Sequence, residues 1–289
     1  MIFLLIAIVC STLIFTLFRL LPKFNAVTFP VIVINYFIAL SCGLLMLESN
    51  YHLSDQLDKA WFRGGLLMGF LFIGLFYLMA YTSQRLGMGV SSVATKMSLV
   101  ISVAYFMITD PSDEVTILKV IAIAIAVLGV LFSSSKDKSS SKAPFYLFLF
   151  PLIIFIGSAG IDIIIGHYSP NLSSDSDRYL FTAAPFMTSA VVGTLVLVIQ
   201  KIKGSLKINA PTVWSGLLLG LINFGSIFFL VKAFESGFIE RSAIVSINNL
   251  GIILLSALTG VFFFSEKLKG KRLLGFGLSI VAIVMLFFA

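Results

Sequence analysis

Two stretches of this chain, GLLMGFLFIG at residues 65–74 and GLLLGLINFG at residues 216–225, carry glycines at the same spacing. In each stretch the second glycine follows the first by four residues, and the third follows the second by five. Both lie inside runs of about 20 apolar residues, the length that crosses roughly 30 Å of hydrocarbon as a helix. The shared pattern predicts two similar membrane-spanning helices in opposite halves of the chain.

The duplication continues downstream of these stretches. At a constant offset of 153 positions, the residues that align are Ala80 with Ala233, Ser83 with Ser236, Val90 with Ala243, and Asp113 with Glu266. The apolar runs at 115–133 and 268–287 then align without a gap. Residues 134–144 lie between the halves within a polar Ser/Lys segment, SSSKDKSSSKA at 133–143. We therefore predict two five-helix repeats, 1–133 and 145–289, joined by a linker.

Composition requires lipid as the solvent for much of this chain. Of its 289 residues, 59% are apolar and 11% charged, and the mean hydropathy is +1.07. Soluble domains carry roughly a quarter charged residues. We expect an all-α integral membrane protein with ten transmembrane helices, since lipid leaves backbone groups no other partners. The predicted spans are 2–21, 28–47, 61–84, 88–108, 115–133, 145–166, 179–200, 212–234, 239–264 and 270–289.

The number of spans and the distribution of charge together predict topology. A repeat of five spans must be inverted relative to its partner, as in many secondary transporters. Connections after odd-numbered spans carry 13 cations and two acids. The positive-inside rule makes that side cytoplasmic, with both termini extracytoplasmic, in a multi-pass protein of the cell (inner, cytoplasmic) membrane. The net charge of +7 reflects this bias and affinity for anionic lipid, and no basic patch for nucleic acid is present.

The two tails, 76–133 and 229–289, each have an aromatic-rich helix, a small-residue helix, an acidic residue and a last helix with Gly129 or with Gly275 and Gly277. This organisation resembles the ten-helix drug/metabolite transporter superfamily, in particular its EamA-like branch, over nearly the whole chain. The resemblance implies a secondary active transporter of a small metabolite, an amino-acid-like solute or an organic anion. Transport would proceed by alternating access at a mid-membrane site between the halves. An exporter of drugs or amphipathic solutes is the alternative.

The chain also departs from that family. Where the family often has a proline in the fourth and ninth helices, this chain has Ser98 and Gly251, and Asn35 replaces a frequent arginine. Gly251 could loosen its helix, whereas Ser98 could bend its helix by hydrogen bonding back to a carbonyl. These departures bear on the substrate class more than on the fold.

Lys96 is the most informative candidate for a substrate-binding residue. It lies about eight residues into the fourth span, where a lysine costs roughly 2.5–3.5 kcal/mol on insertion scales. It could hold a carboxylate or phosphate, or couple a proton. Alternatively, its side chain could lean toward the helix N-terminus and reach the headgroups.

Four asparagines complete the predicted site. Asn248 and Asn249 lie at equivalent depth in the ninth span, and Asn249 aligns with Lys96 in the repeat. Asn35 and Asn223 lie in the second and eighth spans. For all four, interhelical hydrogen bonding is the alternative role. Asp113 and Glu266 precede the fifth and tenth spans, where we expect each carboxylate to complement the dipole of the helix that follows.

Other functional classes fit the chain less well. An intramembrane enzyme would need a catalytic motif, but the chain lacks HExxH and GxSxG, and both histidines, His52 and His167, lie in predicted outer connections. A channel fits an inverted repeat poorly, and there is no Walker motif for ATP. We expect no catalytic residue, metal or cofactor. The expected partners are a small-molecule substrate, the lipid bilayer and a coupling proton or other ion, with a monomer or homodimer as the assembly.

Overall fold

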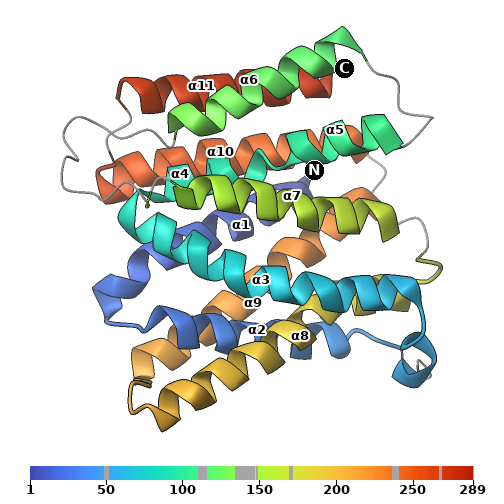
Figure 1. Cartoon of the computed structure of the whole chain (residues 1–289), viewed down its shortest axis with the longest axis vertical. Helices are drawn as coiled ribbons and strands as arrows, with labels where there is room; N and C mark the ends of the chain where they lie inside the picture. The colour runs from blue at the N-terminus through green and yellow to red at the C-terminus, as the bar shows by residue number, and fades with distance from the viewer. Residues whose placement is uncertain are drawn as a thin grey trace. The chain divides into compact units, whose positions relative to one another are not determined.

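The computed structural model describes residues 1–48, 52–109, 116–133, 147, 149–168, 172–235, 241–266 and 269–288 (Figure 1). Within them the chain forms α-helices and two short 3₁₀ helices, Leu21–Phe24 and Leu53–Gln56, and no strand. The α-helices are α1 (Ile2–Leu20), α2 (Thr28–Leu44), α3 (Ala60–Arg85), α4 (Met88–Lys96), α5 (Leu99–Thr109), α6 (Ile117–Ser133), α7 (Phe150–Tyr168), α8 (Asp175–Ile202), α9 (Ala210–Glu235), α10 (Arg241–Phe264) and α11 (Lys271–Phe287).

The all-helical, membrane-type architecture predicted from the sequence is confirmed for the described residues. Each predicted span contains a helix, and the fourth contains two, α4 and α5. Seven described helical segments are long and apolar enough to cross a membrane: Ile2–Phe24, Ala60–Arg85, Met88–Thr109, Phe150–Tyr168, Asp175–Ile202, Ala210–Leu230 and Ile247–Phe264. Helices α2 and α6 are apolar but have 17 residues each, about 26 Å at 1.5 Å per residue. Ten spans therefore remain a prediction.

The helices group into two compact units. Unit 1 comprises Met1–Arg19, Leu78–Gly160 and Ser226–Ala289, and unit 2 comprises Leu20–Tyr77 and Ile161–Gly225. This division does not follow the predicted halves, because each unit takes helices from both. The predicted linker 134–144 lies outside the described residues.

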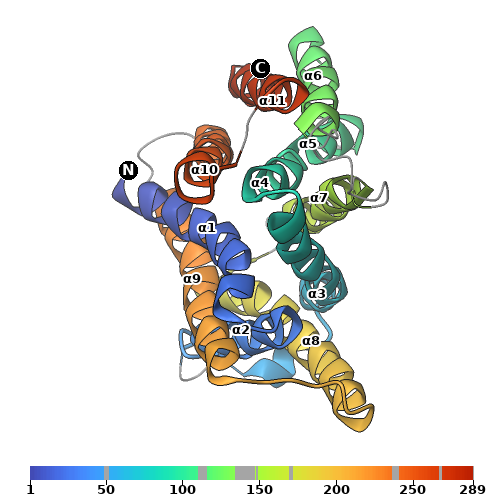
Figure 2. The same ribbon diagram turned by 90° about the vertical axis from the view of Figure 1, so that its left-hand side faces the viewer.

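In unit 1, α6 and α11 lie side by side (Figure 2). Their contact is a stripe of small buried residues. The buried members are Ala122, Ala126, Gly129 and Ser133 on α6, and Gly275, Ser279 and Ala282 on α11. Gly129 lies against Ser279 and Gly275 against Ser133, so the two helices run antiparallel. Small side chains let helix backbones approach closely, which is how helices associate in lipid, where apolar burial gives no driving force.

In unit 2, α2 packs along α8, also antiparallel, since Gly43 meets Ala183 and Gly193 meets Val33. The glycine rows at 65–74 and 216–225 lie in α3 and α9. A Cβ on Gly69 in α3 would lie 2.5 Å from the Pro185 carbonyl oxygen of α8, and other Cβ contacts involve Gly65, Gly216 and Gly220. These four glycines therefore serve close helix packing.

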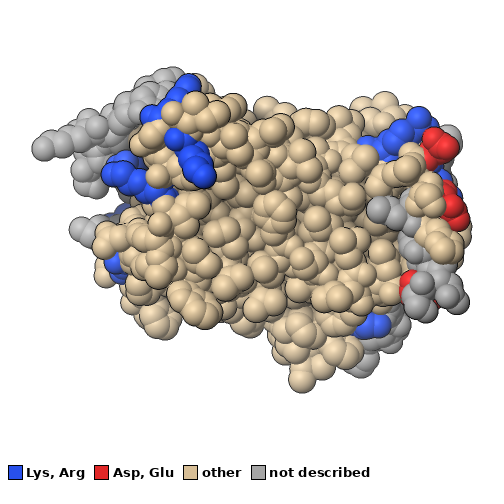
Figure 3. Space-filling view, turned by 90° about the horizontal axis from the view of Figure 1, so that it is seen from below, with Lys and Arg blue, Asp and Glu red and all other residues tan. Residues whose placement is uncertain are grey.

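Helix ends and surfaces follow the same physical rules. The first turn of α8 is closed by a capping box, in which the Ser174 hydroxyl accepts the Asp177 N–H and the Asp177 carboxylate accepts the Ser174 N–H. On the face drawn in Figure 3, uncharged residues form most of the surface, and the charged ones lie toward its edges. Lipid-facing surfaces have this composition because charged side chains are costly in hydrocarbon.

Candidate functional site

Lys96 lies at a break in the helix that was predicted as the fourth span. It is the last residue of α4; Met97 and Ser98 are not helical, and α5 begins at Leu99. The Ser98 hydroxyl donates to the Thr95 carbonyl oxygen at 2.7 Å, which is the back-bonding expected from the sequence. The Ser98 carbonyl accepts in turn the Ser102 hydroxyl at 3.3 Å. Backbone hydrogen bonds continue on both sides of this point, from the Met97 N–H to the Val93 carbonyl oxygen and from the Ile101 N–H to the Ser98 carbonyl oxygen, so the interruption is a local distortion of two residues.

Asn248 and Asn249 lie on α10, which packs against α4 in the same unit. Met88 of α4 lies beside Gly260 of α10, and both helices contribute to one apolar cluster nearer their middles. Lys96 is eight residues from Met88 along the chain, and Asn249 is eleven residues from Gly260, about 12 and 17 Å of helical rise from that contact. Both asparagines are buried, and the Asn248 Oδ1 has no hydrogen-bond partner.

The Asn248 oxygen is one of several unsatisfied buried polar atoms in unit 1. The others among the described residues of this unit are the hydroxyls of Thr12, Thr82, Ser83 and Ser256. Buried polar atoms without partners are rare in native proteins and call for water, an ion or a ligand. They come from α1, α3 and α10, so the polar character extends beyond one helix.

Asn35 and Asn223 belong to unit 2, where the structure brings them together. The Asn223 amide nitrogen donates to the Asn35 Oδ1 at 3.1 Å, and the Asn35 amide nitrogen donates to the Ile32 carbonyl at 3.4 Å. Both side chains are buried and join α2 to α9. This geometry corresponds to the interhelical hydrogen bonding that the sequence left open as the alternative role.

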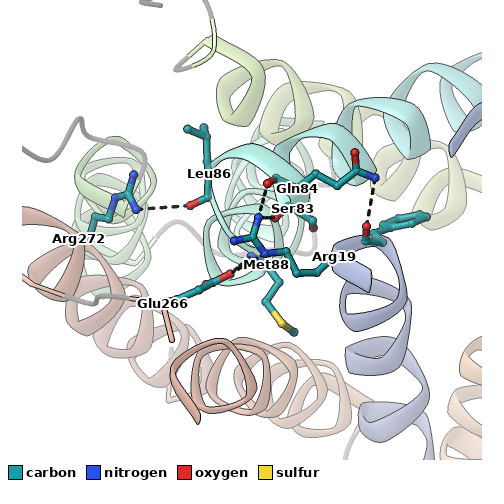
Figure 4. A network of polar contacts seen from close by, with 8 residues as sticks. Arg19, Ser83, Gln84, Leu86, Met88, Glu266 and Arg272 are labelled. Atoms are coloured by element: carbon teal, nitrogen blue, oxygen red, sulfur yellow. Dashed lines mark hydrogen bonds and ion pairs between the residues drawn. The ribbon is translucent and has the colours of Figure 1, made fainter. Parts of the chain in front are cut away.

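A second polar cluster in unit 1 surrounds the turn between α3 and α4 (Figure 4). Arg19, at the end of α1, donates from Nη1 to the carbonyl oxygens of Ser83, at 3.0 Å, and Gln84. Arg272 of α11 donates to the Leu86 carbonyl oxygen at 3.4 Å. The last carbonyls of a helix have no partners within it. The two arginines therefore satisfy groups that the end of α3 leaves open.

Glu266 binds the beginning of α4 in this cluster. Its Oε1 accepts the Met88 backbone N–H at 2.9 Å and lies 3.7 Å from the Arg19 Nε. A Cβ atom on Gly87 would lie 2.7 Å from the Glu266 Oε2, and one on Gly260 would lie 2.6 Å away, so a side chain at either position would displace the carboxylate. Burial raises the pKa of the Glu266 carboxyl, and the Met88 N–H and Arg19 oppose that rise.

The end of α10 aims Glu266 at this position. Ser265 adopts a left-handed conformation, with φ of 54°, and the Glu266 N–H returns to the Gly260 carbonyl oxygen at 2.9 Å. A left-handed residue directly after a helix is a common helix ending, and it reverses the direction of the chain at that point. The local turn therefore directs the carboxylate back toward α4.

The sequence prediction for Glu266 was wrong about which helix it serves. The carboxylate caps α4, more than 170 residues away, whereas the N-cap of α11 is Gly270, which offers no side chain. The sequence prediction used Arg19 and Arg272 only as positive charges that set the topology, and it missed them as parts of a site. One feature of the sequence could have drawn attention to this position: Glu266 is one of only two acids in connections that carry 13 cations. Asp113, its repeat partner, lies outside the described residues.

Comparison with known proteins places the chain beside a relative without assigning it a function. No family model matches the sequence. A protein of Haemophilus influenzae (strain KW20 / Rd), itself described as uncharacterized, is 23% identical over 294 residues, covering 99% of this chain and 97% of the relative. The match extends over both predicted repeats and both compact units.

Proposed function

We propose that this protein is a secondary transporter of a small anionic or zwitterionic solute, and that Lys96 contacts the solute. The observation that carries the proposal is the break after Lys96, beside a helix that bears a buried, unpartnered Asn248 oxygen. Discontinuous helices near the bilayer midplane form the binding sites of many secondary transporters, because the interrupted ends expose polar groups to a solute. A lysine at that depth needs an anionic or wet environment.

Helix packing supports the inverted repeat on which alternating access would depend. The predicted repeat pairs α6 with α11 through the equivalences Ala122–Gly275, Ala126–Ser279 and Gly129–Ala282, all at the offset of 153. These same residues form the antiparallel small-residue stripe in unit 1. Equivalent helices that run antiparallel are what a two-fold axis in the membrane plane requires.

Unit 2 supports the same symmetry through independent contacts. A Cβ on Gly69 of α3 would meet the Pro185 carbonyl of α8 at 2.5 Å, and one on Gly220 of α9 would meet the Asn35 carbonyl of α2 at 3.0 Å. Gly69 and Gly220 are equivalent in the repeat, and their contacts are offset by 150 positions. The proposal therefore assigns the ten helical segments to two inverted sets of five.

The proposal is tested by transport into proteoliposomes. A thermal-shift screen of amino acids, sugar phosphates and nucleotide sugars first selects radiolabelled probes, and their uptake is then compared for the wild type and Lys96→Met. Methionine keeps the length of the side chain and removes its charge. Hydrogen bonds to charged groups contribute about 1.5–3 kcal/mol, so kcat/KM for an anionic probe should fall roughly 10- to 150-fold.

Lys119→Met is the matched control. It removes the same charge from the first turn of α6, in the same unit, and should leave uptake unchanged. Normal uptake by Lys96→Met would refute the anion site and favour an apolar, amphipathic solute. Absence of uptake for every probe by a folded wild-type protein would count against transport of these solute classes.

A further inference from the structure

We propose that Glu266 is a latch at one end of unit 1, and that its release frees the end of α10 from α1 and the α3–α4 turn. The latch gives the proposed transporter a means of opening and closing that end. Its test uses no solute, so failure of the latch and failure of the transport proposal can be told apart.

The first argument is that the seat of the carboxylate is built for it. Two glycines leave the space, since a Cβ on Gly87 or Gly260 would come within 2.7 Å of Oε2. The N-terminus of α4 supplies the Met88 N–H, one of the donors that a helix leaves without partners in its first turn. The left-handed Ser265 orients the chain toward this seat. The space left by the two glycines, the Met88 N–H and the direction of the chain after α10 therefore all favour the Glu266 carboxylate at this position.

The second argument is that the seated carboxylate joins separate elements. Glu266 follows α10, Met88 begins α4, and Arg19 ends α1 while also holding the last carbonyls of α3. The Arg19 and Glu266 side chains are 26% and 12% exposed, so this ion pair is largely withdrawn from water. Removing one side chain from the seat would disconnect α10 from two of these elements at once.

The third argument concerns charge. Glu266 is the one carboxylate of unit 1 whose side chain the structure describes, and the charged groups that face it are Arg19 of α1 and Arg272 of α11. The cost of burying its charge exceeds what these arginines and the backbone donors return, because the net effect is a raised pKa. The buried position therefore favours the protonated form of Glu266 more than water does.

The raised pKa fixes the direction of the pH dependence. A carboxyl released to water titrates near the ordinary value of 4.5, and the seated one titrates above it. The seated state thus binds the proton more tightly, and by linkage it gains stability as the pH falls toward 4.5. It loses that advantage as the pH rises through the raised pKa. Arg19 and Arg272 favour the charged form of Glu266 and so limit the rise of its pKa. They therefore narrow the pH range over which the seated state gains stability.

The distance between two spin labels reports the latch directly. Labels are placed at Arg85→Cys, at the end of α3, and Lys269→Cys, after the latch, both at exposed positions and with Cys10 and Cys42 changed to alanine. Distances are measured by double electron–electron resonance in nanodiscs from pH 4.5 to 8.5. We expect a short distance at low pH and a growing long-distance population as the pH rises.

Three variants test whether the Glu266 carboxylate causes the change in distance between the labels. Glu266→Gln mimics the protonated side chain and should keep the short distance at every pH. Gly260→Ala fills the seat without changing any charge and should give the long distance throughout. Asp175→Asn removes an exposed carboxylate whose pair with Arg178 lies in unit 2, and it should titrate like the wild type.

Two results would overturn the latch. One is a Gly260→Ala protein that keeps the short distance, and the other is a Glu266→Gln protein whose distance follows pH as the wild type does. Circular dichroism and gel filtration establish that each variant is folded before its distance is interpreted. If Gly260→Ala does not fold, Glu266→Ala removes the carboxylate and leaves both glycines in place, and it should also give the long distance at every pH.

Discussion

Exchanging one glycine of α11 for alanine should separate α6 from α11, whereas exchanging its neighbour should not. Gly275 is buried in the small-residue stripe, and Gly277, two residues along the same helix, is exposed. A Cβ on Gly275 would lie 2.7 Å from the Phe132 carbonyl carbon and would also meet the Ser133 nitrogen. A Cβ on Gly277 would have nothing within 4 Å.

The magnitude follows from that geometry. Ordinary van der Waals contact begins at 3.4 Å, so the helices must move apart by at least about 0.7 Å, because the obstructing atoms are backbone and cannot rotate away. A gap of 0.5–1 Å removes a quarter to a half of each dispersion contact along the interface. Overpacking costs about 1–3 kcal/mol in cores. Alanine itself adds up to about 1 kcal/mol of helix propensity at both positions.

We therefore expect Gly275→Ala to be less stable than Gly277→Ala by roughly 1–3 kcal/mol. Equilibrium unfolding in mixed detergent micelles, followed by circular dichroism, measures this difference, and the shared propensity term cancels between the two variants. Equal stability of the two variants, or a more stable Gly275→Ala, would refute the packing that we infer for α6 and α11.

Two further predictions concern unit 2 and topology. In a double-mutant cycle, Asn35→Leu and Asn223→Leu should show a coupling free energy of about 0.6–2 kcal/mol in the same unfolding assay, and additive effects would contradict the interhelical hydrogen bond. A topology reporter fused after Ala289 should report an extracytoplasmic position and one inserted at 139–141 a cytoplasmic one, whereas the reverse pattern would invert the orientation and leave the helix packing unaffected.

The sequence alone was sufficient for the helices and for one of their irregularities. In lipid, a run of about 20 apolar residues has one way to satisfy its backbone, so hydropathy predicts helices directly. The predicted fourth span was continuous, but the bend that the sequence allowed at Ser98 coincides with the end of α4, where the Ser98 hydroxyl bonds to a carbonyl three residues away. The loosening that the sequence left possible at Gly251 is not seen: α10 is continuous there, and Ile8 of α1 packs directly onto that glycine. A glycine in a helix is ambiguous until its neighbour is known.

What the sequence determined is what local chemistry decides: the helices, the polar connections between them and the glycine spacing. Only the tertiary structure decided which side chains meet. Asn223 is hydrogen-bonded to Asn35, 188 positions away, and the Glu266 carboxylate accepts the Met88 N–H, 178 positions away. The reason is physical. An apolar helix specifies its own backbone bonds, but in lipid its packing partner is chosen by matching small residues and polar groups on another surface, and that match exists only once both helices are in place.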